Sequence, residues 1–502
     1  MKRNNAHWTN FVTLAKSTLA FIVITILGLN PAALAALTVG TARPIGRPYE
    51  YPTPFTQAII SDNDGYDYVA APGADLEGKS PVNYIKVRKY AHNQPVTDEV
   101  RVDTAEANVA RFNEPQLCAI PNGTLYLVYQ KLDVNLPRRW VDIFFSRSLD
   151  SGLTWTAPQK LNTPGSVASL ESHPTVMCTA VGGTGIIAVA WMTHDNPQQP
   201  RYLNLYFTRS FDNGDTWLSE VKINDDNSRI HWNFQGPALF FQGPTYGSAY
   251  IAWIDSRNDP QRFNRGDFYL SRSTDNGVTW GPNVRVNHSP GTVEAIGQDA
   301  HLAADENGNV YATWTGEGGI YFNRSLDSAE TWESQDTRIS ADGKLGFSGY
   351  KSFAADHNGR VYVAYLGPSP GLKFRSSSNF GRTWDTEQMI IEDALPYRPP
   401  PYGLPESYTM ATDQNGSIFL IAIDFNEKYS AYGSTLMNAS DDGGATWACG
   451  TRGCRLGRTQ VQPLVQGEIS CNAAGHSAVI WSERRGVNDE FPSLINYGDF
   501  AS

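Results

Sequence analysis

The sequence has little that would suit a nucleic-acid-binding protein or a metalloprotein. Acidic residues outnumber basic ones, 51 to 40, for a formal net charge of −11, and this balance argues against a nucleic-acid partner. The nine histidines show no metal-ligand spacing, and the sequence holds no twelve-residue calcium loop of the EF-hand type. We therefore expect neither a metal nor another cofactor.

Long apolar runs are scarce as well, and the one that is present lies near the N-terminus. A basic segment precedes the run Leu19–Leu29, and Ala33-Leu34-Ala35 then offers a small-residue cleavage site. The run is short for a bilayer span. Residues 1–35 are thus predicted to be a secretory signal peptide, no membrane span is expected, and the mature protein should be secreted, to the periplasm or outside the cell.

Cysteines are few, and their five positions suit an exported protein. Cys449 and Cys454 flank a tight Gly-Thr-Arg-Gly segment and could close a small loop. Cys118 and Cys178 occupy equivalent places in successive repeats and could also pair. Cys471 is left over, and a structural thiol is favoured over a catalytic one because no histidine motif accompanies it.

The sequence also lacks any linker or low-complexity segment, so residues 36–502 are predicted to form a single domain. What it has instead is a repeat. The motif Ser-x-Asp-x-Gly-x-Thr-Trp recurs at intervals of roughly 50–60 residues, a spacing typical of repeat architectures. Its six copies, two of them degenerate at Asn379 and Ala329, are 148–155, 210–217, 273–280, 325–332, 377–384 and 440–447.

Each copy reads as a hairpin turn between two strands. The Asp and Asn side chains bond back to nearby backbone, and the glycine supplies a positive φ. The closing tryptophan is expected to fix the turn to its own unit of the repeat. Because catalysis needs an acid once and this aspartate recurs, we interpret the motif aspartates as structural rather than catalytic or metal-binding.

The motif resembles the Asp box, or bacterial neuraminidase repeat, of the sialidase superfamily of β-propellers. The resemblance covers residues 105–450 and implies that the boxes lie on the turns between third and fourth strands, on the face away from the active site. It is specific for the fold and much less so for the reaction, because many propellers with these boxes do different chemistry.

The internal pattern of each repeat predicts the fold class: all-β, a β-propeller of four-stranded antiparallel blades. The best blade count is eight, six of them with Asp boxes, and seven remains open. Residues 56–103 form one boxless blade and the segment from Gly467 another, which lacks a fourth strand that residues 37–43 could supply beside 493–497. The boxed blades are expected to begin near Asn113, His173, Gln235, Gln298, Tyr350 and Ser407.

Carboxylates, arginines and aromatic residues gather in the loops that this alignment sends to the face opposite the boxes. In the family, a tyrosine nucleophile works with a glutamate, an aspartate is the acid/base, and three arginines bind the substrate carboxylate, which a guanidinium fork suits. The segment Glu406-Ser407-Tyr408-Thr409-Met410 resembles the family's nucleophile segment. The resemblance implies Tyr408 as nucleophile, Glu406 as its partner and Asp133, or else Asp142, as acid/base.

The arginine signature is matched less well. The family begins its first blade with Arg-Ile-Pro, whereas this chain has Ala110-Arg111-Phe112-Asn113-Glu114-Pro115, which places Asn113 two before the proline. The candidate substrate-binding residues are Arg111, Arg257 and Arg398. Arg257 also lies in a Trp-x-Asp-x-Arg pattern, Trp253 to Arg257, that is typical of an ion pair bracing a loop.

Several functions therefore stay open. A secreted exo-glycosidase that removes a terminal acidic sugar, as sialidases do, is the first. The second is a propeller that binds a glycan, with an acidic glycan favoured, without catalysis. The third is a scaffold propeller that recognises a protein, and a polysaccharide lyase on the same fold is a further alternative. The sequence leaves the sugar, the linkage and the oligomeric state open.

Overall fold

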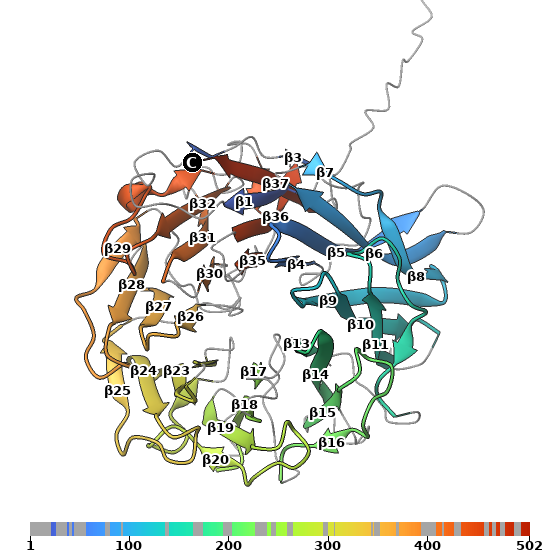
Figure 1. Ribbon diagram of the computed structural model, residues 1–502. Coiled ribbons are helices and arrows are strands. Elements are labelled where there is room, and N and C mark those ends of the chain that lie inside the picture. The colour runs from blue at the N-terminus through green and yellow to red at the C-terminus, as the bar shows by residue number, and fades with distance from the viewer. Residues whose placement is uncertain are drawn as a thin grey trace, which may run out of the picture.

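The computed structural model shows an all-β protein, as predicted. Its sheets stand side by side around one axis, and β4, β9, β13, β17, β26, β30 and β35 lie nearest the centre (Figure 1). The structure describes residues 22–26, 38–39, 43–44, 57–75, 81–91, 94–135, 140–163, 174–193, 203–225, 238–241, 247–258, 265–294, 300–305, 307–342, 345, 352–367, 371–392, 408–413, 416–425, 433–455, 461–463, 468–471, 477–485 and 493–501.

The first half of the ring contains three sheets, each built as an antiparallel meander. The first comprises β4 (Ala58–Ser61), β5 (Tyr66–Asp75), β6 (Val82–Ala91), β7 (Gln94–Pro95) and β8 (Val100–Glu106). The second comprises β9 (Ala110–Ala119), β10 (Leu125–Asp133), β11 (Trp140–Ser148) and β12 (Gln159–Lys160). The third comprises β13 (Thr175–Val181), β14 (Thr184–Thr193), β15 (Asn204–Ser210) and β16 (Val221–Lys222).

The next part of the ring repeats this plan, although some sheets join through short strands. One joined sheet holds β17 (Ala238–Phe241), β18 (Ala249–Asp255), β19 (Arg265–Ser273) and β20 (Val284–Arg285), and then β21 (Val293–Glu294), β22 (Ala300–Ala304), β23 (Val310–Gly316), β24 (Gly319–Ser325) and β25 (Thr337–Ser340). A four-stranded sheet follows, with β26 (Phe353–Ala355), β27 (Val361–Leu366), β28 (Leu372–Ser377) and β29 (Gln388–Ile391).

The last sheet contains the C-terminal strands and the N-terminal ones. It begins with β30 (Tyr408–Thr412), β31 (Ile418–Phe425), β32 (Gly433–Ser440) and β33 (Cys454–Arg455), beside the 3₁₀ turn η3 (Gly450–Arg452). It continues with β34 (Val461–Pro463), β35 (Glu468–Cys471), β36 (Ser477–Arg485) and β37 (Ser493–Ala501), together with β1 (Ile22–Ile26), β2 (Thr38–Val39) and β3 (Arg43–Pro44). Because two sheets merge strands of different predicted blades, the count of eight stays a prediction.

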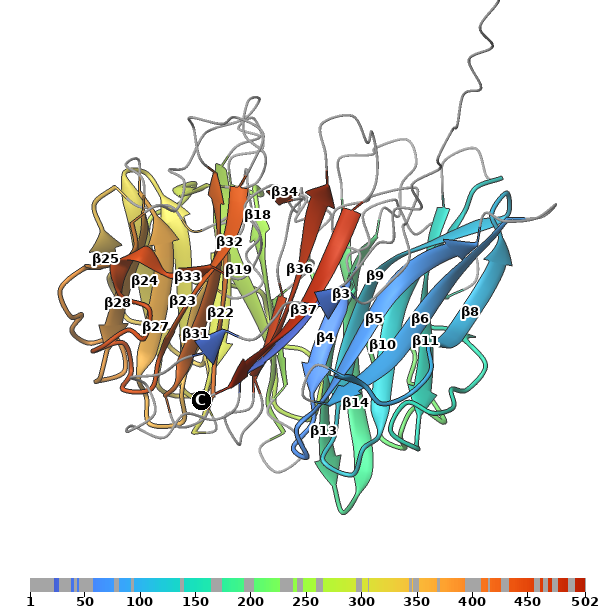
Figure 2. The ribbon, with the colours of Figure 1, turned by 90° about the horizontal axis from the view of Figure 1, so that it is seen from above.

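The two ends of the chain meet in this last sheet, as the sequence predicted. Thr38 lies opposite Ala501, and Arg43 lies opposite Tyr497, so β2 and β3 pair with β37. The first and last units also touch directly, because the Ser61 amide donates to Ser470 Oγ at 2.8 Å. Figure 2 shows β3, β4, β36 and β37 together at this seam. The strand β1 falls inside the predicted signal peptide and pairs with β36, and cleavage of that peptide stays a prediction.

The six motif copies make the same turn. In the second copy, Gly214 N–H donates to Ser210 Oγ at 2.8 Å, and Thr216 N–H and Oγ1–H donate to the two Asp212 oxygens at 2.9 and 2.5 Å. Asn379 keeps this pattern in the fifth copy, because its Oδ1 still accepts from Thr383 N–H at 2.9 Å. The turn bonds support the structural interpretation of the aspartates.

The motif tryptophans contact more than their own unit. Each lies half-buried against an apolar cluster that strands of its own sheet and of the preceding sheet build together. Four of them contact, edge to face, a phenylalanine on the third strand of the preceding sheet, with ring centroids about 5 Å apart. The pairs are Phe145–Trp217, Phe207–Trp280, Phe322–Trp384 and Phe374–Trp447. The motif is therefore a joint between sheets.

Two disulfides are formed, and both were anticipated from the sequence. Cys118 on β9 is bonded to Cys178 on β13, so the innermost strands of neighbouring sheets are covalently joined. Cys449 and Cys454 close the short loop around η3. Cys471 ends β35.

Candidate functional site

The predicted site residues that the structure describes lie at the end of the sheets opposite the motif turns. Arg111 is opposite Leu132 in the strand ladder, and Asp133 is opposite both Ala110 and Trp140. These positions are the beginning of β9, the end of β10 and the beginning of β11, whereas the motif turn follows the end of β11. Arg111 and Asp133 are thus brought to the same end of one sheet. Glu406 and Arg398 lie outside the described residues.

Asp133 and Asp142, the two alternatives for the acid, differ in their surroundings. Asp142 accepts a hydrogen bond from Asn162 Nδ2 at 2.9 Å and forms an ion pair with Lys160 at 2.7 Å. An equivalent hydrogen bond recurs in later sheets, where Asn224 Nδ2 donates to Asn204 Oδ1 and Asn287 Nδ2 donates to Asp267 Oδ1. Recurrence marks Asp142 as structural. Asp133 caps the turn after β10, where its Oδ1 accepts from Asn135 N–H at 2.9 Å.

Arg257 is held in a closely bonded network. Its Nε and Nη2 donate to Asp255 Oδ2 at 3.0 and 2.7 Å, and Asp255 is fully buried. Nη1 donates to Asp225 Oδ1, at 2.7 Å, across the boundary with the preceding sheet, and the guanidinium lies 4.1 Å from the Tyr269 ring centroid. These contacts fit the expected bracing ion pair, which holds the Arg257 guanidinium against neighbouring parts of the protein.

Tyr408 begins β30 and is almost fully buried, with 2% of its surface exposed. Its hydroxyl donates to the Ala364 carbonyl oxygen at 2.8 Å, in β27 of the neighbouring sheet. The ring belongs to the apolar core that the two sheets share. Action as a nucleophile would require this hydrogen bond to open, because the hydroxyl oxygen would have to face a substrate instead.

Glu114 is a residue whose geometry the sequence did not predict. It lies on β9 between Arg111 and Cys118 and has a φ of 47°, in the left-handed region that non-glycine residues seldom adopt. A bulge interrupts the ladder at the same place, between Val128 and Gln130 on β10. Glutamate followed by proline within a strand was the only signal, since proline cannot donate to a ladder.

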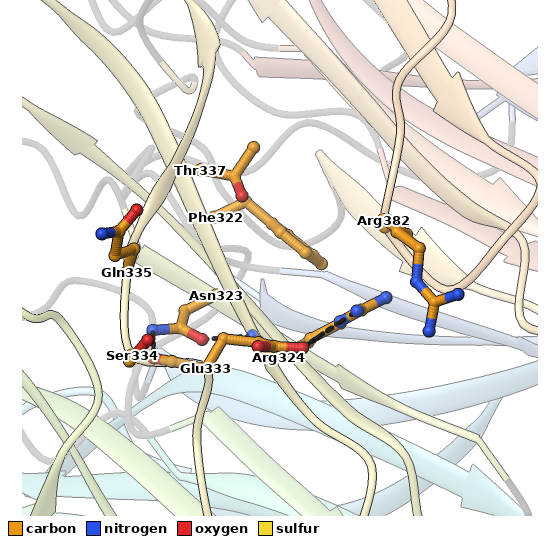
Figure 3. Close-up of a pocket in the computed structure, with 9 residues that line it drawn as sticks. Phe322, Asn323, Arg324, Glu333, Ser334, Gln335, Thr337 and Arg382 are labelled. Atoms are coloured by element: carbon orange, nitrogen blue, oxygen red, sulfur yellow. Dashed lines mark hydrogen bonds and ion pairs between the residues drawn. The ribbon is translucent and has the colours of Figure 1, made fainter.

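Two grooves lined by described residues lie elsewhere, near the motif turns. One of about 260 Å³ lies at the boundary between β24 and the fifth motif copy, and polar side chains line it (Figure 3). There Arg324 Nη2 donates to Glu333 Oε1 at 2.9 Å, and Arg324 Nη1 donates to the Phe380 carbonyl at 2.6 Å. Arg324 thus joins two sheets. A second groove, of about 360 Å³, is lined by Leu270 and Ala329.

Within the described part of the chain, no three histidine, cysteine, aspartate or glutamate side chains gather closely enough to hold a metal ion. The same residues contain no helix with the length and apolar character needed to cross a bilayer. The described candidates are carboxylates and guanidinium groups, which can transfer protons and bind anions, and the hydroxyl of Tyr408.

Comparison with known proteins finds one curated relative at a meaningful level of similarity, and no family model matches the chain. The relative is a protein named sialidase from Bacteroides fragilis (strain YCH46), 28% identical over 322 residues. The match takes in 57% of this chain and 56% of the relative, so the chain spans about half the length of the curated protein it matches.

Solved structures give more distant matches. The NanB sialidase from Streptococcus pneumoniae aligns with a TM-score of 0.41 and 10% identity over 86% of this chain and 83% of that one. A polysaccharide lyase described as a PL25 ulvan lyase aligns with a TM-score of 0.43 and 13% identity, over 74% and 89%.

The ring of antiparallel sheets defines the class of this protein, a β-propeller. With the repeated motif turn and the curated relative, it is a sialidase-like propeller.

Proposed function

We propose that the protein is secreted and acts on extracellular glycans, as an exo-glycosidase that removes a terminal acidic sugar, in the manner of a sialidase. The observation that carries the proposal is the segregation of residues between the two faces of the ring. Arg111 and Asp133 lie at the same end of their sheet, the end that is free of the motif turn, in adjacent pairs of the β9–β10 ladder. The similarity to a curated sialidase supports the same reading.

Each candidate has a chemical task in this proposal. Asp133 donates a proton to the leaving oxygen, and Arg111, with Arg398, binds the substrate carboxylate through a guanidinium fork. Tyr408 attacks the anomeric carbon, and Glu406 accepts its proton. Arg257 braces the neighbouring loop through its ion pairs with Asp255 and Asp225.

A second candidate function is glycan binding without catalysis, through the same face. The buried hydroxyl of Tyr408, already bonded to the Ala364 carbonyl, favours it. In this alternative the arginines still bind an acidic sugar, and no nucleophile is needed.

One preparation of the protein separates the two. A glycan array measures binding, and hydrolysis of a fluorogenic sialoside measures turnover. Hydrolysis that Asp133→Asn abolishes supports the glycosidase. Binding to acidic glycans with no hydrolysis, weakened by Arg111→Ala, supports the binding protein. Neither binding nor hydrolysis would contradict the carbohydrate assignment and direct attention to a protein partner.

A further inference from the structure

In β9, the innermost strand of the β9–β12 sheet, the alternation of side chains between the two neighbouring sheets reverses at Glu114. Before this residue, Phe112 is fully buried in the core shared with the β4–β8 sheet, and Lys131, directly opposite Phe112, lies 5.3 Å from its ring centroid. After it, Leu117 and Ala119 pack against that same core, whereas Cys118 packs on the other side. Even-numbered residues of β9 therefore face the β4–β8 sheet before Glu114, and odd-numbered residues face that sheet after it.

A bulge explains this switch. Asn113 pairs with Gln130, and Gln116 pairs with Val128, so two residues of β9 stand opposite one residue of β10. The extra residue shifts the alternation of side chains by one position. Glu114 takes the left-handed conformation at this bulge, as the first residue of one type of bulge does, and its Oε2 accepts from Gln130 Nε2 at 2.5 Å. Gln130 is 2% exposed, so its amide is fixed.

The bulge decides where Arg111 and Asn113 point. They pair with Leu132 and Gln130, which lie on the face of β10 that Val128 presents to the β13–β16 sheet. Without the extra residue, regular alternation would turn Arg111 and Asn113 toward the β4–β8 sheet, into the core that Phe112 now fills. A charged guanidinium would be costly there.

We propose that the bulge at Glu114 is a functional feature of the glycan site, and that Glu114 is a positioning residue for Arg111 and Asn113. This inference rests on the proposed function. The ligand chemistry is that of an acidic sugar: Arg111 supplies a fork for the carboxylate, and the Asn113 amide supplies a donor and an acceptor for hydroxyl groups. Strain held at a ligand site is a common cost of such positioning.

The test compares two substitutions at Glu114. Valine is β-branched and disfavours a positive φ, so Glu114→Val should displace the bulge, whereas Glu114→Gly allows it. Binding of an acidic glycan should weaken by about tenfold or more in Glu114→Val, and by much less in Glu114→Gly. In an Arg111→Ala background, Glu114→Val should add little, because the residue it positions is gone.

Phe380→Val is the matched control. Phe380 also has a positive φ, 61°, but belongs to a motif turn on the opposite face. The Phe380→Val substitution should lower the melting temperature and leave glycan affinity unchanged. Equal losses of affinity in Glu114→Val with and without Arg111 would overturn the positioning role, as would unchanged affinity in folded Glu114→Val.

A second measurement needs no glycan and thus separates this inference from the proposed function. In an Arg111→Cys variant, a charged thiol reagent should label position 111 readily, after subtraction of the reaction of unsubstituted protein. Adding Glu114→Val should slow the labelling several-fold as the side chain turns toward the core. Equal labelling rates in the two folded proteins would show that the bulge does not aim position 111. Absence of glycan binding by the unsubstituted protein would contradict the proposed function and with it the role of the bulge in a glycan site, whereas the labelling rates would still decide whether the bulge aims position 111.

Discussion

Leu270 packs with Ala329 in the core between β19 and the fourth motif turn, where comparable joints have phenylalanine against glycine. A Cβ added to Gly214, Gly277 or Gly381 would come within 2.4, 2.5 or 2.3 Å of the rings of Phe145, Phe207 or Phe322. Ala329 carries the Cβ that those glycines lack, and the smaller leucine leaves room for it. The two departures from the repeat therefore compensate each other.

This compensation predicts the effects of exchanging the pair. Leu270→Phe should destabilise the protein by about 1–3 kcal/mol, because the ring overlaps the Ala329 methyl group. Ala329→Gly should be close to neutral alone, since it relieves a φ of 63° but removes a methyl group from the core. The double variant should recover most of the loss, as urea unfolding of all four proteins would measure.

The opposite exchange can be made at a neighbouring contact between sheets, where Phe207 lies against Gly277. Gly277→Ala should be destabilising, because its Cβ would meet Phe207 and because φ is 78°. Adding Phe207→Leu should relieve only the steric part. Additive effects in both joints would contradict the packing explanation.

The motif aspartates should contribute to stability in a pH-dependent way. Partial burial raises the pKa of Asp275, but hydrogen bonds from Thr279 and Ser273 outweigh it and lower the pKa from 3.8 to about 2. A lowered pKa in the folded state gives stability that is present above the unfolded value and is lost as pH falls from about 4 through 2.

Asp275→Asn should therefore flatten this part of the stability profile, and thermal unfolding between pH 2 and 6 would measure it. Asn379 shows that the amide fits the turn, so the fold should persist and glycan binding should be unchanged. At neutral pH the loss should be about 1 kcal/mol. A loss of glycan binding without loss of stability would overturn the structural role of the motif aspartates.

Closure of the ring by the chain ends predicts the effect of a truncation. Removing residues 36–45 from the mature protein deletes β2 and β3 and leaves the outer edge of β37 without these partners. The melting temperature should fall clearly. Replacing the same residues by a Gly/Ser segment of equal length should have a similar effect, because glycine and serine form strands poorly. An unchanged melting temperature would argue that these pairings contribute little.

The repeat made the fold predictable because each unit supplies its own turn signals and strand alternation. Strands near Asn113, His173 and Tyr350 appear within a few residues of the expected positions, since Gly-containing turns fix strand ends locally. The partners of the motif tryptophans were not predictable in this way. They depend on contacts between successive units, which the pattern inside one unit does not contain.

The candidate site was predictable only in part, and for a similar reason. Strand polarity placed Arg111 and Asp133 at one end of a sheet. Strand polarity does not determine which neighbouring sheet a side chain faces. The single extra residue at Glu114 reverses the direction of the side chains that precede it on β9. The burial of Tyr408 against Ala364 depends equally on how two sheets pack.

Tyr408→Phe separates catalysis from packing most directly. If Tyr408 is the nucleophile, the substitution should abolish hydrolysis of a fluorogenic sialoside and leave glycan affinity nearly unchanged, because only the attacking oxygen is lost. The same change removes the hydrogen bond to the Ala364 carbonyl, so the free energy of unfolding should fall by about 1–2 kcal/mol in either case.

Ser146→Ala is a suitable control for the stability effect, since its hydroxyl donates to the Thr156 carbonyl at 2.8 Å near the motif turn. It should lose comparable stability and keep full turnover. A Tyr408→Phe protein that loses stability yet still hydrolyses the sialoside would exclude Tyr408 as nucleophile. If the unsubstituted protein binds acidic glycans without hydrolysing any, the buried hydroxyl is a packing feature, and the protein is a glycan-binding propeller.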